Sequence, residues 1–314
     1  MIEIQDIQHA QQRIHSYVRH TPLLHVGPVK RAVPFSSSLY LKLECLQITG
    51  SFKARGAVNK VLSLSPHEAA AGLVTASGGN HGLGLAYAGR LVHAPTYIYL
   101  PQSAPQAKAR KLEEWEAHVI YEGEVWDDAN RAALATAEDN GRTYVHPFAD
   151  PAVIAGQGTI GLEIVRELPD VDSVLVAIGG GGLISGVGSA VKALHPAIKV
   201  IGIEPMGAPT LQRSLQAGKL VELDTIKTRA VSLAPRLSAQ LNLDIAQRFV
   251  DEIVLVSDEE MREGARWLWR EVGVAAEIGS AAPLAALLTG KVQVTPGQKV
   301  CAIICACGDD GIDQ

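Results

Sequence analysis

Short apolar runs alternate along the chain with longer stretches in which apolar residues recur at helical spacing. The runs are rich in β-branched and aromatic residues, which favour extended backbone. Stretches such as 103–116 and 127–140 are typical of amphipathic helices. This alternation predicts an α/β protein whose parallel sheets are flanked by helices. The expected strands are 96–100, 118–121, 174–178, 200–203 and 300–305.

The length of 314 residues exceeds that of most single domains, so we expect two lobes that share a cleft. No internal repeat or low-complexity linker marks a boundary between them. The grouping of the expected elements predicts a small domain over residues 47–144. That small domain is inserted into a large domain formed by residues 1–46 and 145–314.

The charge balance argues against a nucleic-acid or membrane-surface partner, because 28 Lys and Arg residues face 33 Asp and Glu residues. Residues 1–18 are interrupted by charges and predict a helix rather than a signal peptide, so we expect a cytoplasmic protein. The long uncharged run 173–191 contains four consecutive glycines, which predicts a strand, a turn and a helix instead of a membrane span. Because the chain stops shortly after Cys305, we expect no effector domain.

The four cysteines, Cys45, Cys301, Cys305 and Cys307, lack the spacing and histidine partners of a zinc site. Three of them lie in one apolar, strand-like stretch near the end of the chain. We therefore expect reduced, buried thiols.

Lys53 is the first candidate for chemistry. It follows a Thr-Gly pair and a Ser-Phe pair, and small residues come after it, which is a poor setting for a solvated cation. Lysine amines form Schiff bases with carbonyl compounds, including pyridoxal phosphate, and burial makes them nucleophilic by lowering their pKa. The alternative is an ordinary lysine at the start of a helix.

Two glycine-rich segments predict anion-binding loops at helix starts. Gly179-Gly180-Gly181-Gly182-Leu183 follows a buried strand, and its backbone N–H groups can converge on a phosphate. Ordering four consecutive glycines costs backbone entropy, and a purely structural turn hardly needs that many glycines. The segment 75–82 offers a hydroxyl, an amide and free N–H groups that suit a carboxylate. Asn80 and His81 could also be helix-capping residues there.

A literal GxGxxG pattern spans residues 156–161. A dinucleotide site would require a strand directly before it, whereas the preceding residues predict a helical turn. We therefore interpret these glycines as small residues that allow helices to pack closely.

Five blocks of sequence carry a family resemblance: LKLECLQITGSFKARGA, TASGGNHG, HPFADPAVIAGQGTIGLEI, GGGGLISG and GIEP. Their order is that of the pyridoxal-phosphate-dependent threonine and serine dehydratases (ammonia-lyases) of fold type II, and the resemblance covers essentially the whole chain. It implies pyridoxal 5'-phosphate as the cofactor and two lobes, each with a mostly parallel sheet flanked by helices.

The resemblance also implies a role for each matching residue. Lys53 would be the catalytic residue, which forms the Schiff base and then takes the α-proton. The cofactor-binding residues would be Phe52, Lys53, Asn80, Gly179, Gly180, Gly181, Gly182, Leu183, Glu277 and Cys305. The substrate-binding residues would be Ser77, Gly78, Gly79, Asn80 and His81.

The residue that faces the pyridine nitrogen would be Cys305, with Cys307 as an alternative in register. A neutral thiol does not stabilise a protonated ring as a carboxylate does, which favours β-elimination over transamination. Asp309 or Asp310 near that nitrogen would change this argument.

Several departures from the family pattern narrow the function. Members that racemise serine carry a second serine at the position of Gly78, so we expect no racemase activity. The cation site of some members pairs the glutamate at Glu204 with an aspartate where this chain has Thr210, so we predict no metal. The TIADG segment of relatives is replaced at 225–229, so the sequence does not fix which side chain the substrate carries. Arg229 in this segment is either a recognition residue or a solvated loop charge.

The predicted function is removal of water and then ammonia from a β-hydroxy amino acid of the threonine or serine type, giving a 2-keto acid. This makes the protein a carbon-oxygen lyase that acts on a small molecule and has no nucleic-acid or membrane partner. The alternatives are the same chemistry on phenylserine or hydroxyaspartate, a β-replacement enzyme, and a catalytically silent cofactor-binding relative. Because relatives are commonly dimers or tetramers, we expect a homo-oligomer.

Overall fold

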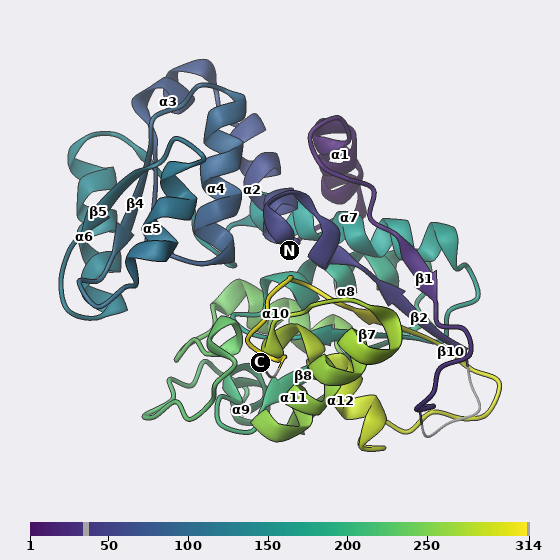
Figure 1. The fold of residues 1–314 in the computed structure, drawn as a ribbon. Coiled ribbons are helices and arrows are strands. Elements are labelled where there is room, and N and C mark those ends of the chain that lie inside the picture. The colour runs from purple at the N-terminus through teal and green to yellow at the C-terminus, as the bar shows by residue number, and fades with distance from the viewer. Residues whose placement is uncertain (34–37, 313–314) are drawn as a thin grey trace.

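The computed structural model of the protein describes residues 1–33 and 38–312. Within them the chain forms two sheets, each with its own helices (Figure 1). Residues 34–37 and 313–314, which belong to the predicted large domain, lie outside the described residues. The α/β fold with parallel sheets that the apolar pattern predicts is confirmed.

The larger sheet has the strand order β1-β2-β10-β7-β8-β9. All neighbouring pairs are parallel except β1 and β2, which are antiparallel. The central strand β7 is buried along its whole length, as expected for a parallel strand that is covered on both faces. The strands are β1 (Leu23–His25), β2 (Ser38–Lys42), β7 (Ser173–Ala177), β8 (Lys199–Pro205), β9 (Glu252–Val256) and β10 (Lys299–Ile303).

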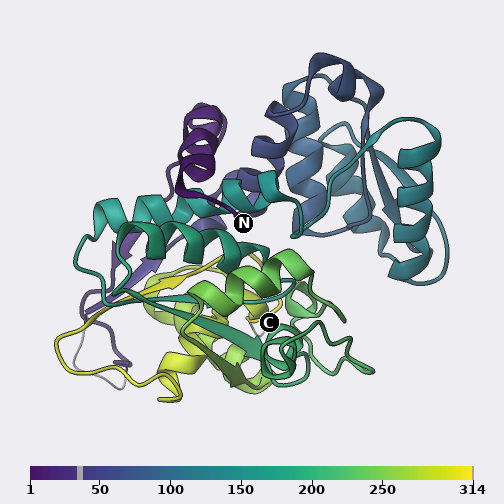
Figure 2. The same cartoon turned by 180° about the vertical axis from the view of Figure 1, so that it is seen from behind.

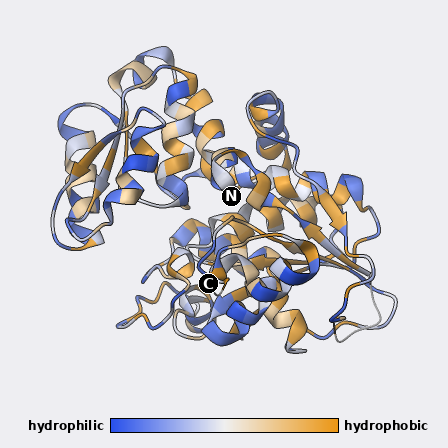
Figure 3. Ribbon diagram, viewed as in Figure 1, coloured by the Kyte–Doolittle hydropathy of each residue, from blue (hydrophilic) through white to orange (hydrophobic). Residues whose placement is uncertain are grey.

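Helices cover both faces of this sheet, with α7 and α8 on one side and α11 and α12 on the other (Figures 1 and 2). Figure 3 shows hydrophobic residues on the strands and hydrophilic residues on the outer sides of the helices. The helices of this part are α1 (Ile4–Ile14), α7 (Pro151–Glu167), α8 (Gly182–Leu194), α9 (Thr210–Ala217), α10 (Gln240–Phe249), α11 (Asp258–Trp267) and α12 (Ala282–Leu288). No described helix combines the length and apolar character needed to cross a bilayer.

The smaller sheet has the strand order β5-β4-β3-β6, and all of its neighbouring pairs are parallel. Its strands are β3 (Leu73–Thr75), β4 (Thr96–Leu100), β5 (His118–Tyr121) and β6 (Thr143–Tyr144). The helices of this part are α2 (Lys53–Leu62), α3 (Pro66–Ala71), α4 (Asn80–Leu91), α5 (Gln106–Glu113) and α6 (Trp126–Asp139).

All five expected strands are present: 96–100 and 118–121 match β4 and β5, and the ends of the other three differ by one or two residues. The strand expected at 300–305 ends at Ile303, so Cys305 lies beyond it. The helix expected at 103–116 begins at Gln106, because Pro105 precedes it in an extended conformation. Strands β1, β2, β3, β6 and β9 were not among the expected strands. Strand β2 ends in a lysine, which does not suggest a buried strand.

The GxGxxG glycines lie inside α7, so the prediction that they serve helix packing is confirmed. A Cβ atom on Gly156 would come within 2.6 Å of the Cα of Gly56 in α2. A Cβ atom on Gly161 would come within 2.9 Å of the Cβ of Ala190 in α8. These distances are too short for real contacts, so α7 passes α2 and α8 at near backbone contact.

A buried cluster of charges joins α2 to the large part of the molecule. The guanidinium of Arg55 in α2 bonds both carboxylate oxygens of Glu44 at 2.8 Å and both of Glu163 at 2.6 and 2.9 Å. Lys42 in β2 donates to Glu163 at 2.7 Å. Because Arg55 and Lys42 are fully buried, their charges depend on these carboxylates for compensation.

The pKa of Glu163 shows which effect dominates in this cluster. Burial acts to raise it, but Arg55 and then Lys42 stabilise the carboxylate and bring the pKa below its ordinary value. Glu163 is therefore ionised at neutral pH.

Neutralising Glu163 is expected to destabilise the protein strongly. The substitution Glu163→Gln leaves two buried cations with one carboxylate fewer, which costs about 3 kcal/mol of unfolding free energy. The control is Glu167→Gln, one turn further along α7, whose side chain is 29% exposed. That control is expected to cost less than about 1 kcal/mol. Urea titration of both variants measures the difference, and equal losses would contradict the role given to the cluster.

Candidate active site

Lys53 is the first residue of α2, and the turn before it has an unusual backbone. Thr49 and Gly50 have φ values of 63° and 77°, a left-handed conformation that is uncommon for threonine. The Nζ atom of Lys53 donates to the carbonyl oxygen of Pro147 at 2.6 Å. Burial lowers the pKa of Lys53 to about 8, although Cys305 acts in the opposite direction. The positive end of the α2 dipole also disfavours a cation there.

Two histidines lie close enough to Lys53 for its charge to affect them. Burial and then the charge of Lys53 lower the pKa of His81 to about 3 and that of His146 to about 4. His81 donates from Nε2 to the carbonyl oxygen of Val145 at 2.9 Å, so its buried Nδ1 is an acceptor, and that atom has no partner in the described part of the chain. Both imidazoles are neutral at neutral pH.

His146 was not predicted as a site residue, although it opens the HPFADP segment. Its Nδ1 atom accepts hydrogen bonds from the backbone N–H groups of Phe148 and Ala149 at 3.2 and 2.9 Å. The proton of the neutral ring is therefore on Nε2. The same turn provides the Pro147 carbonyl that holds Lys53, so the segment supports the amine directly.

The glycine loop Gly179 to Gly182 lies at the start of α8, which begins at Gly182. Gly181 has a φ of 95°, where a side chain would be strained. Among the described residues, no acceptor is found for the backbone N–H groups of residues 179–184. Unpaired N–H groups at the start of a long helix form a cradle for an anion.

The structure also corrects one argument about these glycines. A Cβ atom on Gly180 would come within 2.3 Å of the Phe148 ring, and one on Gly179 within 2.9 Å of the Ser232 carbonyl oxygen. The loop therefore has a packing reason for glycine at these positions. Four glycines do not by themselves indicate a phosphate, and the unpaired N–H groups are the stronger observation.

The second predicted loop precedes α4, and the alternative that Asn80 or His81 caps this helix is wrong. The N-cap residue is Gly79, and the side chains of Asn80 and His81 bond elsewhere. Within the described ranges, the N–H groups of residues 77, 78 and 80–82 have no acceptor. The N–H group of Gly79 makes a long contact of 3.4 Å with Ser77 Oγ.

Glu277 is brought to Asn80 from a distant part of the chain. The Nδ2 atom of Asn80 donates to Glu277 Oε1 at 2.9 Å, so two of the predicted cofactor-binding residues are in contact. Burial raises the pKa of Glu277, which the Asn80 hydrogen bond partly offsets. The contact joins the start of α4 to the segment before α12.

Cys305 and Cys307 both lie against the turn before Lys53. The carbonyl oxygen of Cys305 accepts a hydrogen bond from the N–H group of Phe52 at 3.1 Å, and the N–H group of Cys307 donates to Gly50 at 2.8 Å. The Sγ atom of Cys305 lies 3.1 Å from Ser280 Oγ, and burial raises the pKa of this thiol to about 12. All four cysteines are free, but Cys307 is exposed, so the prediction of burial is wrong for it.

Three other positions that the sequence singled out, Glu204, Thr210 and Arg229, form hydrogen bonds away from Lys53 and the two loops. Glu204 accepts hydrogen bonds from the N–H groups of Leu211 and Gln212 at 2.8 and 2.9 Å, and burial raises its pKa to about 7. Thr210 donates to the Pro235 carbonyl oxygen at 2.7 Å. Arg229 is exposed, and its N–H group donates to Asp258 at 2.7 Å. Among the described contacts, none of these bonds involves Lys53 or the two loops.

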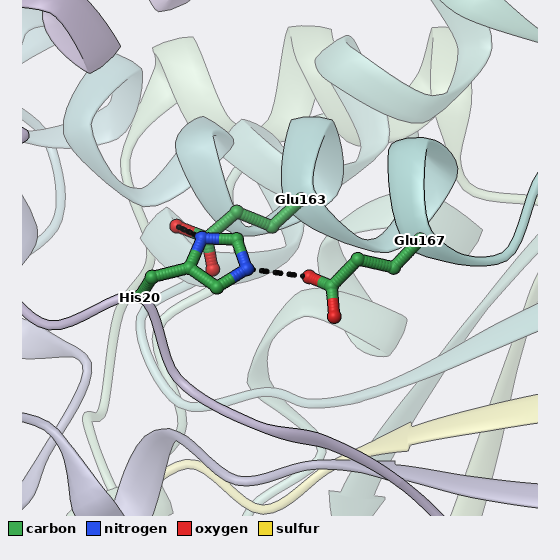
Figure 4. A group of neighbouring side chains, drawn as sticks. All are labelled: His20, Glu163 and Glu167. Atoms are coloured by element: carbon green, nitrogen blue, oxygen red, sulfur yellow. Dashed lines mark ion pairs between the residues drawn. The ribbon is translucent and has the colours of Figure 1, made fainter.

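One cluster has side chains of the kind that bind metals, but its charges are already compensated. His20 lies between Glu163 and Glu167 on neighbouring turns of α7 (Figure 4). Both carboxylates are paired with Lys42, and Glu163 is also paired with Arg55. Two cations next to these oxygens repel a divalent ion, so the cluster is an ion-pair network.

Comparison with known proteins places these residues in a family. The chain is 41% identical over 304 residues to the L-threonine ammonia-lyase of Thermotoga maritima, which covers 97% of this chain and 75% of that protein. The structure of maize serine racemase matches with a TM-score of 0.92 at 31% identity over 99% of this chain and 94% of that one. The structure of threonine deaminase isoform 2 from Solanum lycopersicum matches with a TM-score of 0.92 at 32% identity over 97% and 83%.

The model of the family described as pyridoxal-phosphate dependent enzyme matches residues 14–306, which include Lys53 and both glycine-rich loops. The expected family and cofactor are therefore confirmed. The chain belongs to the family of pyridoxal-phosphate-dependent enzymes.

Proposed function

We propose that this protein is an ammonia-lyase that removes water and then ammonia from a small β-hydroxy amino acid of the threonine or serine type. The observation that carries the proposal is the setting of Lys53, an amine with a lowered pKa next to two loops of unpaired N–H groups. One loop suits a phosphate and the other suits a carboxylate. The ammonia-lyase and threonine deaminase among the relatives support the same reaction.

The residues present fit pyridoxal phosphate. The unpaired N–H groups of residues 179–184 suit its phosphate, and the amine of Lys53 suits its aldehyde. The Phe52 ring centroid lies 5.1 Å from Lys53 Nζ, and Leu183 is in the first turn of α8. Asn80 and Glu277, which are hydrogen-bonded to each other, would offer an amide and a carboxyl group to the edge of the ring. Cys305 is a neutral thiol, so it adds no negative charge beside the ring nitrogen.

The bound cofactor supplies an electron-accepting ring that stabilises negative charge at the substrate α-carbon. The chain itself supplies the base, because Lys53 with a pKa of about 8 is partly neutral at physiological pH and can take the α-proton. The loop of residues 77–82 orients the carboxylate through its N–H groups. The neutral imidazoles of His81 and His146 keep further positive charge away from the amine.

A serine racemase is the second candidate, because the maize enzyme has the same fold. Racemisation requires a second acid or base that reaches the opposite face of the α-carbon. The position next to Ser77 is Gly78, which has no side chain to serve as that group. The loop chemistry therefore favours elimination.

The substrate side chain and the organisation of the protein are part of the proposal. Arg229 is exposed, and its described hydrogen bond goes to Asp258 and not to Lys53 or the two loops, which supports a small substrate over phenylserine or hydroxyaspartate. The two sheets support a small domain over 47–144 within a large domain of 1–46 and 145–314. We assign the protein to the cytoplasm and expect a homo-oligomer.

Removing the amine of Lys53 tests the proposal. The wild-type protein is expected to release ammonia and a 2-keto acid from L-threonine or L-serine, whether or not sulfide is added. Lys53→Ala is expected to lose at least about a thousandfold in kcat, because the base is gone. Lys60→Ala, on the same helix and paired with Asp150, is the matched control and keeps its activity. A coupled keto-acid assay measures both.

Two results of that assay would contradict the proposal. Product that forms only in the presence of sulfide would indicate a β-replacement enzyme. Visible absorbance of bound cofactor without ammonia from any β-hydroxy amino acid would indicate a catalytically silent relative.

Uptake of the cofactor by the apo-protein is expected to depend on pH through Lys53. Only the neutral amine attacks an aldehyde, and burial lowers the pKa of this amine from its ordinary value of 10.5 to about 8. The uptake rate therefore rises with pH around a midpoint of about 8 and levels off above about pH 9. Stopped-flow absorbance from about pH 6 to about pH 11 measures it. A midpoint near 10.5 would show that the amine is solvated.

Serine that escapes elimination is expected to keep its configuration. Because Gly78 provides no second base, D-serine should stay below about one part in a hundred of the turnover, a discrimination of about 2.7 kcal/mol in barrier height. Chiral chromatography of the remaining serine measures it. Accumulation of D-serine at a rate similar to that of pyruvate would make the racemase the better assignment.

A further inference from the structure

Trp126 makes a hydrogen bond that bears on the geometry of the loop before α4. It is the first residue of α6, and its indole Nε1–H donates to the carbonyl oxygen of Ala76 at 2.8 Å. Ala76 is buried and lies between the end of β3 and the loop of residues 77–82. The start of α6 is itself fixed, because Asp128 accepts hydrogen bonds from the N–H groups of Glu124 and Val125.

This hydrogen bond determines the direction of the next N–H group. A peptide bond is planar and trans, so the C=O of one residue and the N–H of the next point in opposite directions. The indole turns the Ala76 carbonyl toward α6, and the N–H group of Ser77 therefore points away from α6. Among the described residues, that N–H group has no acceptor.

The next peptide plane, between Ser77 and Gly78, is also fixed, because its carbonyl oxygen lies against the first turn of α4. A Cβ atom on Gly82 would come within 1.9 Å of the Ser77 carbonyl oxygen, so this oxygen lies directly against the first turn of α4. Two consecutive carbonyl oxygens are thus turned toward neighbouring backbone or indole groups. A carbonyl oxygen that rotated toward the bound anion would repel it, so both planes have to stay in place.

We propose that Trp126 is a positioning residue for the substrate carboxylate, acting through the Ala76–Ser77 peptide. This rests on the proposed function only in the assignment of the loop of residues 77–82 to that carboxylate. Trp126 does not touch the substrate, and its side chain contributes little to the core because the residue is 47% exposed. Its N–H group, and not its apolar surface, is what the loop requires.

Binding of propionate to the holoenzyme tests this role without turnover. Propionate has the carboxylate of the substrate but no amine that could react with the cofactor. Trp126→Phe keeps a ring and removes the donor, so the Kd of propionate measured by titration calorimetry should rise about fivefold, the value of one hydrogen bond. The KM for L-threonine should rise by about the same factor with kcat within about twofold, since the base is unchanged.

A matched control separates this effect from the general loss of a surface indole. Trp269 is 48% exposed and lies in the π-helical turn Leu268–Val272. Trp269→Phe is expected to leave both the Kd of propionate and the KM unchanged. Trp126→Leu, which also removes the ring, should weaken propionate binding as much as Trp126→Phe does, with the thermal midpoint checked for each variant.

Two outcomes would overturn the inference: a Kd for propionate in Trp126→Phe within twofold of wild type, or an equal weakening in Trp269→Phe. Failure of the proposed function would look different. In that case the wild-type holoenzyme would release no keto acid from any β-hydroxy amino acid, while the calorimetric comparison would still report on the loop.

Discussion

The pairing of Arg55 with Glu44 and Glu163 is the interaction on which the position of Lys53 depends. The guanidinium of Arg55 donates along one edge to Glu44, from the segment after β2, and along another edge to Glu163, from α7. Arg55 lies two residues after Lys53, so the first turn of α2 is tied to the large part of the molecule next to Lys53. A buried charge tolerates little displacement from its partners, which makes this attachment rigid.

Three helices begin at the site, and this arrangement explains its electrostatics. Helices α2, α4 and α8 start at Lys53, Asn80 and Gly182. The first turns of α4 and α8 present N–H groups without acceptors in the described chain, and the positive ends of the helix dipoles favour anions. The same field disfavours additional positive charge, in line with the lowered pKa values of Lys53, His81 and His146. The site therefore suits anionic groups and holds an amine that is partly neutral at physiological pH.

Much of the fold was predictable because apolar β-branched runs and amphipathic stretches are local signals. Strand β2 was not, because it ends in Lys42, and the charge of this buried lysine is compensated by Glu163 and Glu167, which come from α7. The loops were recognised from their glycines, but anion binding is only part of the reason for glycine at Gly179 and Gly180. Phe148 and Ser232, from other segments, also pack against these two positions. His146 was missed because nothing in its local sequence shows that its ring lies near Lys53.

The sequence by itself determined the family and the cofactor and made Lys53 the candidate amine, because these depend on residue types in short ordered blocks, which can be read without knowledge of the fold. Tertiary structure alone decided which distant groups meet. The contact of Asn80 with Glu277, the placement of Cys305 against Phe52, and the hydrogen bond from Trp126 to Ala76 all join segments that are far apart in the chain. Hydrogen bonds act over about 3 Å, so their partners are set by how helices and sheets pack and not by spacing along the sequence.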